Sequence, residues 1–379
     1  MRPRHVALAL LTVLQSVLVV LAISPQARVG VKTFLLIPQL LPGAPVRPLM
    51  FLTPAPSKSE VRYGYGEEER IADLYRPAGG GRHGAIILFL GVNPAGREDP
   101  RVVRLASGLA RIGLVVLVPY SQDMVDERVK PQEVGALVAA FQYLEQQPFV
   151  APGRVGFAGF CVGASLAVVA AEDQRINKRV RFVNDFDGYY DLRDYIVEIV
   201  TKSFRMDSTI QAWEPDDLAQ RVVTRELIEN MPAPEDRAEL GRVFINGEPL
   251  ESLNQDVITP DGQVLYQLLT STDEQEAYRL LAQLPPSVEG LVAPLSPSSD
   301  IGGLQAKLFV MHDRRDDLVP YVESRRLVAA VDGNVPIHYT EFSFFQHVDP
   351  TRHVPPATLL HELWKLYRHL YGLMRLALG

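Results

Sequence analysis

Cysteine is nearly absent from this sequence, because Cys161 is the only one among 379 residues. A single thiol cannot form a disulfide within the chain, and it cannot build a cysteine zinc cluster. The chain also lacks a basic excess: 38 lysines and arginines stand against 45 acidic residues, and the formal net charge is −7. Nucleic-acid-binding domains usually carry a basic face, so we expect no nucleic-acid partner.

A phosphate-binding signature is also missing from the place where glycines gather. Residues 79–81 are three consecutive glycines, but no Lys-Ser or Lys-Thr pair follows them, so they predict only a turn. Neither this region nor the rest of the sequence implies a cofactor or a metal ion. The overall composition, 47% hydrophobic and 22% charged, excludes wholesale disorder and low-complexity scaffolds.

The first 60 residues raise the question of a membrane. Residues 6–23 contain only three polar side chains, and 18 residues rise about 27 Å as a helix, close to the roughly 30 Å thickness of the hydrocarbon layer. We therefore expect an N-terminal apolar helix that anchors the chain in a membrane. A cleaved signal peptide and a buried helix are the alternatives, although the Ser24-Pro25 exit fits cleavage poorly. The basic flanks favour an extracytoplasmic main domain, with Arg2 and Arg4 on the cytoplasmic side.

Residues 34–52 are apolar as well, but four prolines lie among them, at positions 38, 42, 45 and 48. These prolines are expected to break any helix there. The segment then serves as a tether, as a strip on the membrane surface, or as a lining of the entrance to a pocket. We accordingly assign residues 1–60 to an anchor or signal with an apolar linker, and 61–379 to the main domain.

Short apolar runs alternate with helix-periodic segments in the main domain, which predicts an α/β fold with a mostly parallel sheet flanked by helices. The expected strands are 70–75, 84–90, 114–118, 154–160, 181–185, 307–312 and 336–341. The expected helices are 101–112, 131–146, 162–171 and 359–376. Residues 195–299 interrupt this alternation with helical patterns, so we expect a helical insertion between two strands of the sheet.

The single cysteine lies between two glycines, Gly159 and Gly163, at the junction of an expected strand and an expected helix. This arrangement is typical of a nucleophile elbow, whose sharp turn needs small neighbours. The start of the helix would favour a thiolate at Cys161, and the Val162 N–H could bind a developing oxyanion. The alternative is a buried structural cysteine.

A base and an acid are expected later in the chain, in the order nucleophile, acid, histidine. His347 follows one expected strand and would exchange protons with Cys161. Asp316 lies 31 positions earlier, after another strand, and could orient the imidazole, although Asp313 and Asp317 flank it. Three other histidines compete with His347 for the role of the base. His353 lies six positions after it, and His361 and His369 are expected at the surface of the last helix.

These residues resemble the α/β-hydrolase superfamily, and most closely its dienelactone hydrolase branch, which uses cysteine in place of serine. The similarity rests on G-F-C-V-G-A at 159–164, H-D-R-R-D-D-L-V-P at 312–320 and F-F-Q-H-V-D-P at 344–350. The D-x-x-V-P register of the resemblance puts the acid at Asp316. It also implies that the N–H of Gly91 or Val92 completes an oxyanion hole, and that the insertion at about 195–299 acts as a lid.

The resemblance implies a hydrolase that cleaves small-molecule esters or lactones through an acyl-cysteine on a Cys161–His347–Asp316 triad. Acyl transfer or a peptidase-like reaction could use the same triad. A protein of another class, a membrane-tethered binding protein without chemistry, is also compatible with the sequence. The sequence gives no indication of an oligomeric state.

Overall fold

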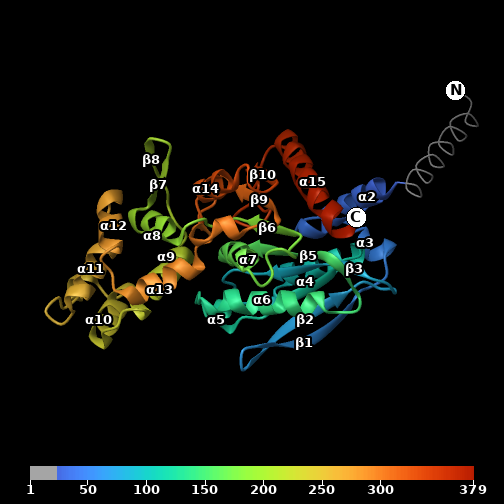
Figure 1. Cartoon of the computed structure of the whole chain (residues 1–379). Helices are drawn as coiled ribbons and strands as arrows, with labels where there is room; N and C mark the ends of the chain where they lie inside the picture. The colour runs from blue at the N-terminus through green and yellow to red at the C-terminus, as the bar shows by residue number, and fades with distance from the viewer. Residues whose placement is uncertain (1–23) are drawn as a thin grey trace, which may run out of the picture.

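The computed structural model describes residues 24–379, which form an eight-stranded sheet between two layers of helices, with a helical insertion beyond one end of the sheet (Figure 1). The strand order is β1-β2-β4-β3-β5-β6-β9-β10. The strands are β1 (Ser57–Tyr65), β2 (Glu68–Arg76), β3 (His83–Phe89), β4 (Val115–Pro119), β5 (Val150–Phe160), β6 (Phe182–Phe186), β9 (Lys307–Asp313) and β10 (Ile337–Phe342).

The central strands β3, β4, β5, β6, β9 and β10 are parallel to one another, whereas β1 and β2 form an antiparallel edge. The inner strands are continuous apolar runs because helices cover both of their faces. The expected strands are all present, with boundaries shifted by a few residues. β1 was not expected, because an edge strand of sequence SKSEVRYGY faces solvent and contains no apolar run.

Two hydrophobic cores lie on the two faces of the sheet. The helices of the first face are α6 (Gln132–Glu145), α7 (Val162–Glu172) and α14 (Val322–Val331). The helices of the second face are α4 (Pro100–Ile112), α15 (Pro356–Leu378) and α2 (Pro25–Leu40). Two single turns, α3 (Leu49–Leu52) and α5 (Gln122–Val125), complete this body.

The insertion is largely helical, as expected, and includes one hairpin. Its elements are α8 (Leu192–Thr201), β7 (Ser203–Met206), β8 (Thr209–Ala212), α9 (Asp217–Glu229), α10 (Pro234–Phe244), α11 (Pro260–Leu269), α12 (Glu274–Leu281) and α13 (Pro286–Leu295). In Figure 1 it extends to the left of the sheet, between β6 and β9 in chain order. It leaves the sheet at the carboxyl end of β6 and leads to the start of β9.

The N-terminal region departs from expectation at its prolines. Pro38 lies inside α2, which continues to Leu40 and packs against α4 and α15. The expectation that proline breaks the helix at this position was wrong. The proposed anchor at residues 6–23 lies outside the described residues. From residue 24 onward, no helix is both long and apolar enough to cross a bilayer.

Candidate active site

Cys161 lies at a strained turn between β5 and α7. Its φ of 54° and ψ of −138° are unusual for a residue with a side chain, and it is the N-cap of α7. The two flanking glycines make this turn possible. A Cβ at Gly159 would lie 2.3 Å from the Ala164 Cα, and a Cβ at Gly163 would lie 2.5 Å from the Leu90 carbonyl oxygen.

Substituting Gly163 by alanine is expected to lower the free energy of unfolding by about 1–3 kcal/mol, because the new methyl group must displace the backbone after β3. Urea denaturation measures this change. Gly290 in α13 offers a matched control, since a Cβ there has no heavy atom within 4 Å. Gly290→Ala should be neutral or stabilise by up to about 1 kcal/mol. Equal destabilisation by the two substitutions would contradict the steric argument.

The loop after β3 closes against this elbow. A Cβ at Gly91 would lie 2.9 Å from the Cys161 Cβ, so the backbone of this loop lies beside the candidate nucleophile. Val162 is the first residue of α7, so no carbonyl group within the helix can accept from its N–H. Val162, Gly91 and Val92 all line the cavity that also contains Cys161. The three residues expected around an oxyanion thus share one site.

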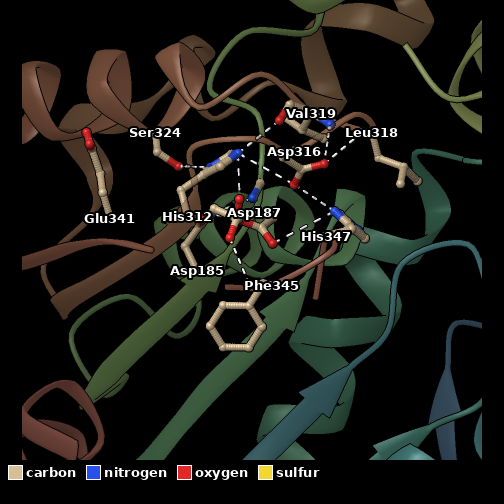
Figure 2. A network of polar contacts seen from close by, with 12 residues as sticks. Asp185, Asp187, His312, Asp316, Leu318, Val319, Ser324, Glu341, Phe345 and His347 are labelled. Carbon is tan, nitrogen blue, oxygen red and sulfur yellow. Dashed lines mark hydrogen bonds and ion pairs between the residues drawn. The ribbon is translucent and has the colours of Figure 1, made fainter. Parts of the chain in front are cut away.

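His347 and Asp316 are in direct contact. The His347 Nδ1–H donates to Asp316 Oδ2 at 2.7 Å, and the other carboxylate oxygen accepts from the backbone N–H groups of Leu318 and Val319 (Figure 2). Burial works against a charged imidazole, but the charge of Asp316 and the hydrogen bond to it outweigh burial and raise the pKa of His347 well above its usual value. Burial likewise opposes ionisation of Asp316, and His347 outweighs it, so the pKa of Asp316 is lowered.

The two flanking aspartates do not take this position. Asp313 accepts from the backbone N–H groups of Arg315 and Phe345, at 2.8 and 2.9 Å, and so holds together the two loops that carry Asp316 and His347. Asp317 contacts the insertion through its carbonyl oxygen, which accepts from the Asp216 N–H. Of the three aspartates considered, the structure brings Asp316 to the imidazole.

Asp187, directly after β6, is a second carboxyl group beside His347 that the sequence reasoning missed. Its Oδ2 lies 3.8 Å from His347 Nδ1 and has no hydrogen-bond partner within residues 24–379. Burial and the negative charge of Asp316 raise the pKa of Asp187 well above its usual value. A carboxyl group at the end of a parallel strand, next to the strand that carries the acid, was the signal that could have found it.

Asp187, His312 and Asp316 also form the one cluster in the described chain with the spacing of metal ligands. Both nitrogens of His312 are already used: Nε2–H donates to the Val319 carbonyl oxygen at 2.9 Å, and Nδ1 accepts from the Ser324 hydroxyl at 2.5 Å. Burial lowers the pKa of His312, which keeps this imidazole neutral. The cluster is therefore a hydrogen-bonded support for Asp316 and offers an ion little free capacity (Figure 2).

The competing histidines lie elsewhere. His353 and His361 are exposed, as expected for residues without a catalytic role. His369 was expected at the surface, but it is fully buried, and its Nε2–H donates to the Asn184 side-chain oxygen at 2.9 Å. Burial, together with His338, lowers its pKa to about 3. The inward face of α15 therefore carries one neutral, structural histidine.

A cavity of about 550 Å³ opens at Cys161 and His347. Its walls are mostly apolar and come from both layers of the fold. The sheet-covering helices α2, α4 and α15 contribute Leu36, Leu40, Leu105, Leu109, Leu366 and Leu370, and the insertion contributes Leu218, Val222, Val223, Leu227, Leu291 and Leu295. Arg101 and Asp349, which form an ion pair, are among its few charged residues.

The insertion is fixed to the loop that carries the acid. The Trp213 indole N–H donates to the Asp316 carbonyl oxygen at 2.9 Å, and the Tyr195 hydroxyl donates to that of Leu318 at 2.6 Å. Sequence patterns could not reveal these contacts, because more than 100 positions separate each pair. The insertion and the acid loop therefore form one connected structure beside the cavity.

Residues 98–188 match the dienelactone hydrolase family, and this segment contains the elbow. A curated protein of Bradyrhizobium sp, described as a probable 2-oxo-3-(5-oxofuran-2-ylidene)propanoate lactonase, is 29% identical over 153 residues. That alignment covers 36% of this chain and 56% of the lactonase, so the chain spans about half the length of this relative.

Solved structures share the fold at low sequence identity. Acylaminoacyl peptidase of Pyrococcus horikoshii superposes with a TM-score of 0.50 and 13% identity, over 86% of this chain and 43% of the peptidase. A puromycin-hydrolyzing peptidase of Mycobacterium tuberculosis gives a TM-score of 0.50 and 15% identity, over 89% and 41% of the two chains. These similarities concern the fold and do not extend to the substrate.

The sheet, its elbow and its helical layers define the α/β-hydrolase fold. Within this fold, the segment 98–188 is similar to the dienelactone hydrolase family. The match ends at residue 188, before the acid and the histidine, so the roles of these two residues depend on the geometry described above.

Proposed function

We propose that this protein hydrolyses carboxylic esters or lactones through an acyl-cysteine intermediate. The observation that carries the proposal is the 2.7 Å hydrogen bond from His347 to Asp316, at the cavity into which the Cys161 elbow also opens. Nδ1 of the imidazole faces the acid, so Nε2 is the nitrogen available for proton exchange with Cys161. This arrangement meets the requirements of a nucleophile, a base and an orienting carboxylate.

The reaction would proceed in two steps. The Cys161 sulfur attacks the carbonyl carbon, the N–H groups of Val162 and of Gly91 or Val92 stabilise the oxyanion, and the alkoxide leaves with a proton from His347. A water molecule, deprotonated by His347, then attacks the thioester, and the acid product and the free thiol are released. In a lactone, the ring C–O bond breaks in the first step, the alcohol so formed stays joined to the acyl group through the carbon chain, and the second step releases a single hydroxy acid.

The apolar cavity supports a substrate with a substantial hydrocarbon portion. Its leucine and valine side chains offer few hydrogen bonds, and burial of apolar substrate surface contributes about 25 cal/mol per Å². The loop after β3 and the elbow hold the reacting carbonyl, and the hydrocarbon portion extends along the leucine-lined walls. Product analysis with added alcohols or amines distinguishes hydrolysis from acyl transfer.

Replacing His347 with asparagine is expected to slow alkylation of Cys161 by iodoacetamide at neutral pH by about tenfold or more. The raised pKa of His347 makes its imidazole a better proton acceptor, and asparagine removes the group that would take the proton from the thiol. Mass spectrometry of the intact protein measures the rate, because the chain has a single cysteine.

The exposed His361, on the same chain but outside the cavity, provides the control, and His361→Asn should leave the alkylation rate unchanged. A wild-type rate no faster than that of an ordinary thiol of pKa about 8.5 would count against the proposed enzyme. That result would favour a binding protein that has the hydrolase fold but performs no chemistry.

A further inference from the structure

Exposed apolar side chains are concentrated on one part of the described molecule. Nine of the twelve large hydrophobic residues that are exposed between residues 24 and 379 lie on α2, α3, the loop between them, and the first half of α15. We call this set the apolar face; its members are Val31, Phe34, Val46, Met50, Phe51, Leu52, Leu359, Leu360 and Trp364. The other three lie on the insertion.

The apolar face is held in place by buried contacts, so its side chains cannot easily turn inward. Leu49 anchors α3 in the core, whereas the neighbouring Phe51 is 81% exposed. Arg111 of α4 donates to the carbonyl oxygens of Leu49 and Thr53, which fixes the turn from both ends. A patch of this kind on a rigid support is typical of a surface that contacts a partner.

The charge distribution indicates the chemistry of that partner. The chain has 45 acidic residues, and all of them lie from Glu60 onward, whereas six lysines and arginines lie before that position. On α15 the only acidic residue is Glu362, which is buried and paired with Lys365 at 2.7 Å, while Arg368 and Arg375 are exposed. The elements that carry the apolar face therefore have basic side chains and few acidic ones, although the protein as a whole is acidic.

We infer that the apolar face docks on a bilayer containing anionic lipids. Exposed Phe, Leu and Trp side chains insert at the level of the headgroups, and neighbouring Lys and Arg side chains attract anionic lipid. The position in the sequence agrees with this assignment, because α2 directly follows the apolar residues 6–23. α2 and α15 also line the cavity with their inner faces, which places a bilayer next to the proposed acyl site.

Trp364 makes the docking measurable. The chain has only two tryptophans, so a full-length Trp213→Phe protein reports from the apolar face alone. With vesicles of phosphatidylcholine and phosphatidylglycerol whose acyl chains are brominated, we expect bound protein to lose about half of its tryptophan emission. The loss should decrease in vesicles of phosphatidylcholine alone and at high salt, since both weaken the attraction of the basic side chains.

Variants distinguish docking through the apolar face from attachment through the N-terminal residues alone. The triple variant Phe34→Ser, Phe51→Ser, Leu52→Ser, made in the Trp213→Phe chain, should lose most of the quenching. The matched triple variant Ile210→Ser, Leu250→Ser, Val257→Ser alters the exposed apolar residues of the insertion and should keep it. Protein that sediments with vesicles while Trp364 emission stays unquenched would overturn the inference. So would a stable dimer that shields Trp364 in the presence of vesicles.

Discussion

Replacing Cys161 with alanine is expected to lower kcat/KM for a short-chain nitrophenyl ester or a lactone by at least about 10⁴-fold. The substitution removes the atom that would form the covalent intermediate, and only substrate binding and the oxyanion donors remain. These can leave a residual rate above that of water, so the variant should be slow but measurable. Steady-state kinetics measure the effect, with controls for the purity of each enzyme preparation.

Cys161→Ser is the informative companion, because it keeps an attacking atom of similar position while exchanging sulfur for oxygen. A hydroxyl is a weaker acid than a thiol, and the imidazolium beside it cannot generate a comparable anion. We expect the activity of Cys161→Ser to lie between those of the wild type and the alanine variant. In rapidly quenched samples of the wild type, we expect an acyl adduct on Cys161. Turnover by Cys161→Ala equal to that of the wild type would exclude the acyl-cysteine reaction.

The sequence predicted those parts of the fold and of the site that depend on neighbours in the chain. The parallel strands followed from continuous apolar runs, and the elbow followed from glycines two positions on either side of Cys161. The crowding at Gly159 and Gly163 explains why this local pattern was informative. The pattern reports a close approach of backbones that only glycine allows.

Long-range contacts could not be predicted in the same way. Asp187 follows β6 and His347 follows β10, and the two residues approach each other because β6, β9 and β10 are consecutive in the sheet, although 160 positions separate them. α2 shows a related effect. A proline inside a helix costs about 3 kcal/mol, and burial of Leu36 and Ile37 against the neighbouring helices returns about 1.5–3 kcal/mol for each side chain. Packing therefore outweighs the local preference at Pro38.

The two carboxyl groups beside His347 have different expected roles, which paired substitutions can separate. Asp316→Asn should lower kcat by up to about 10⁴-fold, because the amide no longer holds the correct imidazole tautomer or balances its charge. Asp187→Asn should change kcat by less than about tenfold. Burial and Asp316 raise the pKa of Asp187 well above its usual value, which favours the protonated carboxyl group, and asparagine preserves the shape and charge of that form.

Unfolding measurements at two pH values test that protonation state independently of activity. A carboxyl group whose pKa is raised by folding binds more protons in the folded state, so it reduces the free energy of unfolding as pH rises above its unfolded pKa. The asparagine side chain does not titrate, so Asp187→Asn should become more stable relative to the wild type between pH 4 and pH 8 in urea denaturation. A loss of kcat in Asp187→Asn as large as that in Asp316→Asn, with no such change in relative stability, would instead make Asp187 the ionised partner of His347.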